Sequence, residues 1–262
     1  MAASNSNRTQ TERADQTRGR ILDAAVRQFS ESGLAGARTE QIAEEAGVNK
    51  ALLYYYFKSK EDLYAAALES VFEGVQTASI AVLQTEASAG ERFVQIILDN
   101  FDRSYSHPSV RTLMQQEMVR LHQGEENRMA QMAERFFRPM WARVQEVLEE
   151  GIRSGELIPV DPQQIRYGAL GANVFYFLTA PLVRLAFGFD PLERGELERR
   201  RSAVIEYLGQ AIFIDREQGA RVAARVLAAT PMPEPTDLSR NANCKGCNIE
   251  AVPTSANKAR QK

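Results

Sequence analysis

Lysines and tyrosines recur at helical spacing between residues 50 and 60, and their side chains suit contact with a phosphate backbone. Lys50 and Tyr54 are four residues apart, so a helix places them on one face. Ammonium and phenol groups both bind phosphate oxygens, and the small Ala51 keeps the same surface low enough to enter a groove. We therefore expect recognition of nucleic acid, with these candidate contacts: Thr39, Asn49, Lys50, Ala51, Leu52, Tyr54, Tyr55 and Lys60.

The other candidates are expected to contribute in different ways. Leu52 could touch a thymine methyl group, the apolar feature of the major groove. Lys60 adds a positive charge close to a helix N-terminus, and both features favour a phosphate. Thr39 and Asn49 are first of all helix caps, because their side-chain oxygens suit the free N–H groups of a first turn, and any contact with DNA is additional.

Short helices must position these residues. Apolar residues at four-residue spacing predict a first helix that starts near residue 18 and stops at residues 32–33. A second helix, capped by Thr39, ends before Gly47, which can adopt a left-handed turn, and Asn49 caps the third. Ser59 caps a fourth helix, with an acidic residue three positions later. This is a helix-turn-helix pattern, and its inner face is expected to consist of Val48, Leu53 and Phe57.

The segment Ile21 to Leu68 resembles the DNA-binding domain of the TetR family of regulators. The most specific part is IAEEAGVNKALLYYYFKSKEDL, from Ile42 to Leu63, which matches the family's spacing without gaps. The resemblance implies a homodimer that binds a palindromic operator in double-stranded DNA and usually represses. In the family, DNA is approached by the positions that match Thr39, Lys50, Ala51, Tyr54, Tyr55 and Lys60. Leu52 and the run of three tyrosines depart from the commoner pattern and leave the operator sequence open.

Periodicity and composition predict an all-α chain. The formal net charge is -2, so any DNA binding must come from a local basic surface. Prolines and small polar residues dominate after residue 230 and suit a disordered tail. We predict a disordered N-terminal arm over residues 1–16, a DNA-binding domain over 17–77, a helical ligand-binding and dimerisation domain over 78–229, and a disordered tail over 230–262.

The second domain is rich in apolar and aromatic residues, most of which are expected to form an ordinary core. A cavity between helices that accepts a small apolar or amphipathic effector is the functional interpretation. Pro139 and Pro181 should each kink a helix and leave room for it. Glu117 and Arg120 are possible polar anchors, and the candidate ligand-binding residues are Tyr105, Met114, Glu117, Met118, Arg120, Phe137, Trp141, Asn173, Tyr176 and Phe177. The order of segments here is weakly similar to regulators of the AcrR type.

Two helical segments, residues 165–187 and 201–213, carry small and apolar faces. They are the candidates for a dimer interface in which two helices from each subunit form a four-helix bundle. Residues 167–183 are apolar enough to suggest a membrane span, but a buried bundle helix is favoured and no membrane partner is predicted. The polar N-terminus and the two cysteines suit a reducing cytoplasmic location.

Two other classes of function fit part of this pattern. One is a helical module that binds proteins rather than DNA, and the other is an enzyme that uses an apolar helical pocket. The chain lacks a phosphate-binding glycine loop, a serine nucleophile elbow and a carboxylate-rich metal motif, so we predict no catalytic residue, cofactor or metal site. Cys244 and Cys247 have redox or zinc-ligand spacing, but zinc needs about two further ligands and none is nearby.

Overall fold

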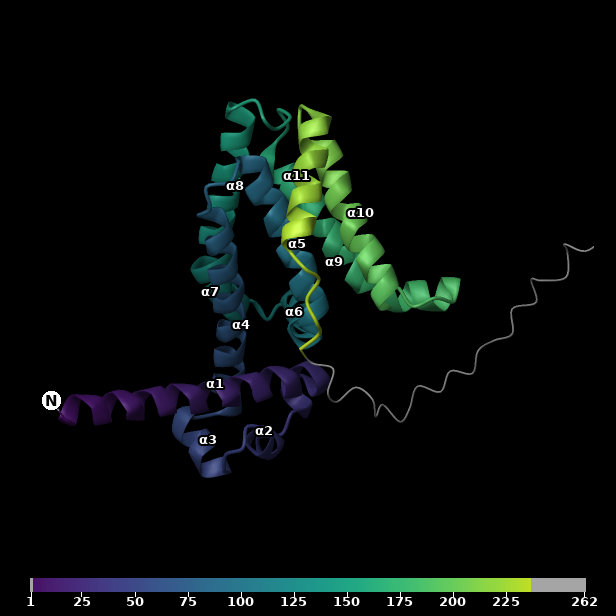
Figure 1. Ribbon diagram of the computed structural model, residues 1–262. Coiled ribbons are helices and arrows are strands. Elements are labelled where there is room, and N and C mark those ends of the chain that lie inside the picture. Colours follow the sequence, from purple (N-terminus) through teal and green to yellow (C-terminus); the bar gives the residue numbers. More distant parts are fainter. Residues whose placement is uncertain (1, 237–262) are drawn as a thin grey trace, which may run out of the picture.

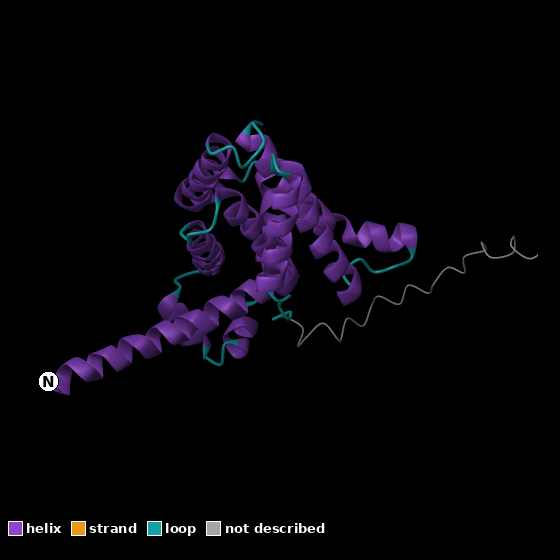
Figure 2. Ribbon diagram, turned by 45° about the horizontal axis from the view of Figure 1, so that its top comes forward, coloured by secondary structure: helices purple, strands orange, loops and turns teal. Residues whose placement is uncertain are grey.

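The computed structural model describes residues 2–236, most of which are α-helical (Figures 1 and 2). This confirms the expected all-α fold. The elements in chain order are α1 (Ala2–Gly36), α2 (Thr39–Glu45), α3 (Lys50–Tyr56), α4 (Lys60–Leu83), α5 (Ala89–Ser106), α6 (Pro108–His122), α7 (Glu126–Met132), the π-helical turn η1 (Ala133–Phe137), α8 (Arg138–Arg153), α9 (Pro162–Phe187), α10 (Arg194–Ile212) and α11 (Arg216–Ala229).

Helices α1 to α4 form the N-terminal region. Helices α2 and α3 lie on one side of α1, and α4 leaves the other side into the rest of the molecule (Figure 1). Gly47 has a φ of 66°, which confirms the left-handed turn between α2 and α3. Asn49 and Ser59 accept hydrogen bonds from the backbone N–H groups of Leu52 and Asp62, at 2.7 and 3.0 Å. Both predicted caps are therefore present, and they fix where α3 and α4 begin.

A continuous apolar core holds this region together. Ile21 and Phe29 of α1, Leu53 of α3 and Tyr64 of α4 are fully buried. The rings of Phe29 and Tyr64 meet edge to face, with their centroids 4.8 Å apart. The same cluster extends to Leu113 of α6. The core beneath the helix-turn-helix is therefore shared with the second region, which consists of the helices from α5 to α11.

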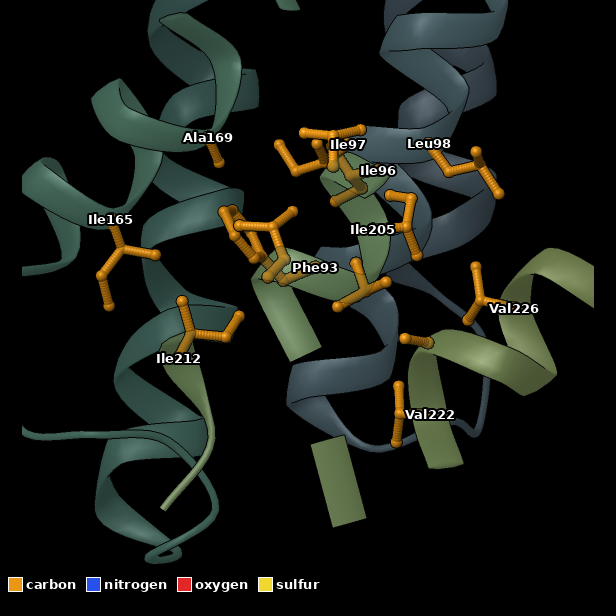
Figure 3. Packing of buried hydrophobic residues seen from close by; sticks show 14 of the residues in the cluster. Phe93, Ile96, Ile97, Leu98, Ile165, Ala169, Ile205, Ile212, Val222 and Val226 are labelled. Carbon is orange, nitrogen blue, oxygen red and sulfur yellow. The ribbon is translucent and has the colours of Figure 1, made fainter. Parts of the chain in front are cut away.

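Helix α4 joins the two regions without a linker. It runs unbroken from Lys60 to Leu83, so the predicted domain boundary at residues 77–78 falls inside one helix. In the second region α5 is central and packs against α8, α9, α10 and α11. Figure 3 shows Phe93 and Ile97 of α5 packed among side chains such as Ala169 of α9, Ile205 of α10 and Val222 of α11. This core fixes the positions of the helices that surround α5.

The N-terminus differs from expectation. A disordered arm is predicted over residues 1–16, whereas α1 is helical from Ala2 and projects beyond the other helices (Figure 1). No proline or glycine occurs between Ala2 and Arg18. Once the buried part of α1 has formed, each added residue extends the helix without a new nucleation step. A polar segment can therefore continue the helix without a core of its own.

The predicted single helix over residues 126–153 contains a π-helical turn. The turn spans Ala133–Phe137, directly before Arg138 and Pro139. Proline has no N–H to donate and its ring clashes with the carbonyl of the preceding turn. The wider π turn accommodates Pro139 while the chain remains helical.

Within a single chain, helix α9 is not the buried bundle helix that the sequence predicts. Only 17% of its most apolar window is buried, and among residues 2–236 it is the one helix long and apolar enough to cross a membrane. Its C-terminal part and the start of α10 project away from the other helices (Figures 1 and 2). The sequence pattern misses this because an apolar helix looks the same whether its own chain or another molecule covers it.

The chain after α11 is held in place as far as residue 236, so the predicted disorder from residue 230 is wrong for these residues. The N–H and hydroxyl of Thr236 both donate to the carbonyl of Ser106, at 2.9 and 2.7 Å. Arg201 donates to the carbonyl of Thr230 at 2.7 Å and forms a buried two-bond pair with Asp102. The remainder of the predicted tail, with Cys244 and Cys247, lies outside the described residues.

Candidate nucleic-acid interface

Helix α3 presents one exposed face above a buried one. Leu53 and Phe57 are 0% and 5% exposed, whereas Tyr55 is 80% exposed. Lys50 and Ala51 are also exposed, and Leu52 and Tyr54 are 36% and 38% exposed. The expected contact residues of α3 therefore share its solvent side. The buried pair holds this surface against the core, as a helix that enters a DNA groove requires.

Lys50 is paired within the protein. Its ammonium group forms an ion pair with Glu40 of α2, and it lies 5.8 Å from the centre of the Tyr54 ring. The hydrogen bond with Glu40 raises the pKa of Lys50 and lowers the pKa of Glu40. Both groups are exposed, so solvent screens the attraction. A phosphate or base edge could therefore compete with Glu40 for this lysine.

Thr39 supports Tyr54 and does not cap α2. The N-cap of α2 is Arg38, and Thr39 is the first residue of the helix. Thr39 is 6% exposed, and its hydroxyl lies 3.2 Å from the Tyr54 hydroxyl. The predicted cap is wrong by one position because Arg38 already has the extended backbone of a cap. Thr39 instead orients the phenol group.

Lys60 ties the start of α4 to the end of α1. Its ammonium group donates to the carbonyls of Ala35 and Ala37, at 3.2 and 3.3 Å. Carbonyls at a helix C-terminus lack partners within the helix, and a lysine can satisfy them. The phosphate contact expected of Lys60 stays a prediction. In the structure this lysine holds the connection between α1 and α2 in place.

Two arginines beside the helix-turn-helix were not among the sequence candidates. The Arg18 guanidinium lies 5.6 Å from the centre of the Phe57 ring, at the end of α3. Arg20 reaches the turn at Gly47, where its Nη1 atom lies 3.4 Å from the position that a Cβ atom would take. Both residues are exposed and basic. Because they precede α3 by some thirty positions, only the fold brings them beside it.

The expected ligand-binding residues separate into two groups. The first lies where α4, α6 and α7 meet. There, the buried Glu117 accepts a hydrogen bond of 2.5 Å from the Tyr64 hydroxyl. Arg120 and Arg128 approach the same carboxylate at 3.6 and 3.7 Å. Burial raises the pKa of Tyr64, and the hydrogen bond to Glu117 raises it further.

The apolar candidates of the first group differ in burial. Met114 and Phe137 pack against the same apolar cluster, whereas Met118 is 38% exposed.

The second group lies around α5, α8 and α9. Asn173 is fully buried and donates to the Ile97 carbonyl at 3.0 Å. Phe177 and Tyr176 contact the Phe101 ring, with centroids 5.2 and 6.1 Å apart. Tyr105 packs against the same core. Trp141 lies between the two groups, because its ring contacts Phe137 of the first group at 5.6 Å and Arg166 of α9 at 4.7 Å. The sequence candidates therefore do not converge on a single cluster of contacts.

The fold and the exposed face of α3 define a helix-turn-helix DNA-binding protein, and comparison with known proteins identifies its family. The profile of bacterial regulatory proteins of the tetR family matches residues 21–67. The profile of the tetracyclin repressor-like C-terminal domain matches residues 86–218. The chain belongs to the TetR family of transcriptional regulators. Its members are DNA-binding regulators and not enzymes, so neither an enzyme nor a module without DNA binding describes this chain.

Two curated relatives illustrate the similarity. The chain is 35% identical over 120 residues to the transcriptional repressor NicS of Pseudomonas putida. This alignment covers 46% of this chain and 56% of NicS. The match thus spans less than two thirds of the length of NicS. The chain is 30% identical over 171 residues to the transcriptional regulator RutR of Escherichia coli. This alignment covers 64% of this chain and 77% of RutR.

Solved structures share the fold. A TetR/AcrR-family regulator from Thermobifida fusca has a TM-score of 0.55 at 25% identity, over 73% of this chain and 95% of the other. The regulator FadR of Bacillus subtilis, solved with stearoyl-CoA, has a TM-score of 0.56 at 22% identity, over 72% of this chain and 96% of the other. These likenesses place both regions of the chain in one known architecture.

Proposed function

We propose that the chain is a homodimeric repressor that binds a palindromic operator and is released from it by a small amphipathic ligand. The exposed face of α3 carries the DNA-binding part of this proposal. In a dimer two such helices would enter successive major grooves, about 34–36 Å apart. The relative NicS is itself named a repressor, which supports repression as the outcome of binding. The cytoplasm, where the DNA of a bacterium lies, is the proposed location.

The dimer proposal rests on the outer face of α9. Six large apolar side chains of this helix are more than half exposed, and contiguous apolar surface of this kind marks an interface. The first five recur at intervals of one, three or four residues, so they form a stripe along one side of the helix, and Phe187 follows at its C-terminal end. A second copy of the stripe would cover them across a two-fold axis. These residues are Val174, Phe175, Leu178, Leu182, Leu185 and Phe187.

The oligomeric state tests this arrangement. Replacing both Leu182 and Leu185 with glutamate should shift the protein from dimer to monomer in sedimentation velocity, because like charges would face each other in the interface. Val119→Glu is the control, since Val119 is a 58% exposed apolar residue on α6. A wild-type monomer at micromolar concentration would contradict the proposal.

DNA selection tests the function. Fragments recovered from a random pool should contain an inverted repeat, and their affinity should fall steeply with salt as counterions are displaced. Lys50→Ala should change the preferred sequence, and Tyr54→Phe should weaken binding to all sequences. Selected fragments that share no common sequence, or an affinity that does not change with salt concentration, would count against the proposal.

A further inference from the structure

The interface between α8 and α9 buries a positive charge that has no negative partner. Arg166 is 6% exposed, and its Nε atom is buried without a hydrogen-bond acceptor. Among the side chains that the structure describes, none provides a carboxylate within ion-pair distance of its guanidinium. Two aromatic rings lie beside it instead, Trp141 at 4.7 Å and Tyr167 at 5.2 Å from ring centre to guanidinium carbon. Buried charges in proteins are as a rule paired, so this arrangement calls for an anion.

A second unsatisfied polar atom lies on the same face of α9. Asn173 follows Arg166 by seven residues, which is two helical turns and roughly 10 Å along the axis. Asn173 is fully buried, and its amide nitrogen donates to the Ile97 carbonyl and to the side chain of Asn100. Its amide oxygen accepts no hydrogen bond. The small Ala169, 3% exposed, lies between the two polar groups on the same face.

The surroundings of these two atoms are apolar and aromatic. Phe177, one turn beyond Asn173, contacts Phe101 of α5. Its ring also lies 4.9 Å from the guanidinium carbon of Arg111. The Arg111 guanidinium donates to the backbone carbonyl of Ser104, which carries no full charge. The inner face of α9 therefore combines apolar contact with positive charge and one free acceptor.

From this geometry we propose that the effector is an elongated amphipathic carboxylate held by Arg166. The planar guanidinium can donate two parallel hydrogen bonds to a carboxylate. The apolar body of the ligand extends from Arg166 along Ala169, which is packed against α5 in the structure, so binding requires α9 to separate from α5. A hydroxyl or N–H group at the far end donates to the free amide oxygen of Asn173. This inference rests on the proposed function, since it names the chemical class of the ligand that the repressor responds to.

Trp141 is the only tryptophan in the chain and reports directly on this site. A carboxylate bound to Arg166 would change the contact between its guanidinium and the indole ring, and hence the tryptophan fluorescence. The probes are octanoate, octanol and omega-hydroxyoctanoate, titrated into the full-length protein. Octanoate should give a saturable change and bind at least about tenfold more tightly than octanol. Omega-hydroxyoctanoate should bind more tightly than octanoate, because only it can satisfy Asn173.

Substitution of the arginine provides the control. Arg166→Gln keeps a hydrogen-bonding side chain but removes the charge, so the preference for octanoate over octanol should disappear. Arg166→Lys keeps the charge and should retain part of the preference. Arg143→Gln changes an exposed arginine on α8, two residues from Trp141, and should leave the preference intact.

The outcomes separate this inference from the function on which it rests. Absence of a saturable response to octanoate, equal affinity for octanoate and octanol, or an unchanged preference in Arg166→Gln would overturn the inference. Release of DNA by a neutral ligand would leave the repressor function intact and show that Arg166 does not select the effector. Failure to bind any DNA would contradict the proposed function while the fluorescence result still stood.

Discussion

Two of the charges that this molecule buries, Glu117 and Arg166, lie in different regions and have opposite surroundings. Where α4, α6 and α7 meet, the Glu117 carboxylate has the Tyr64 hydroxyl and two arginines around it. Between α8 and α9, the Arg166 guanidinium has only aromatic rings beside it. The first arrangement is complete in the protein alone and joins the DNA-binding helices to the second region. The second is incomplete, which is what a site for a charged ligand requires.

The largest effect is expected from Glu117→Gln. It removes the carboxylate that Arg120 and Arg128 share, although Arg120 keeps its second ion pair with Glu125. Breaking a buried ion pair from one side costs about 3 kcal/mol of unfolding free energy. Urea unfolding measures the loss. Glu198→Gln, which removes an exposed pair with Arg194, should change stability far less. Similar urea midpoints for the two variants would show that the contacts of Glu117 do not stabilise the junction between the two regions.

Tyr64→Phe should cost somewhat less, about 2 kcal/mol, because it removes one hydrogen bond to a buried carboxylate. The pH dependence checks the cause. The pKa of Tyr64 is raised above its ordinary value of 10.0 in the folded protein. Above pH 10 the tyrosine ionises in the unfolded chain but not in the folded one, so stability falls as the pH rises. This fall should be shallower in Tyr64→Phe, and parallel curves would contradict the assignment.

Arg166→Met is expected to have the opposite sign. Without ligand, it removes an unpaired buried charge and should raise the unfolding free energy by about 1 kcal/mol. Urea unfolding of the ligand-free protein measures the change. A loss of stability as large as that of Glu117→Gln would mean that Arg166 is part of the folded framework and would end the contrast between the two regions.

The smallest effect concerns the exposed pair of Lys50 and Glu40. Glu40→Gln frees Lys50 for DNA, and affinity for the selected operator should rise by about twofold without a measurable change in stability. Fluorescence anisotropy of labelled DNA measures it. Weaker binding by the variant would indicate that Glu40 positions Lys50 and does not compete for it.

The sequence predicted the helix-turn-helix better than the rest of the molecule. The Asn49 cap, the turn at Gly47 and the buried Leu53 all follow from local chemistry within a few residues. Local chemistry could not reveal that Lys60 bonds to the end of α1 or that Arg18 lies beside Phe57, because folding brings distant segments together.

The second region shows more clearly which contacts cannot be predicted from the sequence. Glu117 was interpreted as a ligand anchor, but its partner Tyr64 lies 53 residues earlier in the chain. The sequence does not mark Arg166 as a ligand-binding residue, since an arginine in an apolar helix does not show whether a carboxylate lies opposite. Absence of a partner is a property of the packed structure, and only the packed structure reveals it.

The most direct test of the whole account is the anisotropy of labelled operator DNA, titrated with octanoate at fixed protein concentration. The account predicts that wild-type protein binds the DNA and releases it as octanoate saturates, whereas Arg166→Gln binds the same DNA and keeps it. DNA that stays bound to the wild-type protein, or equal release from both proteins, would contradict it.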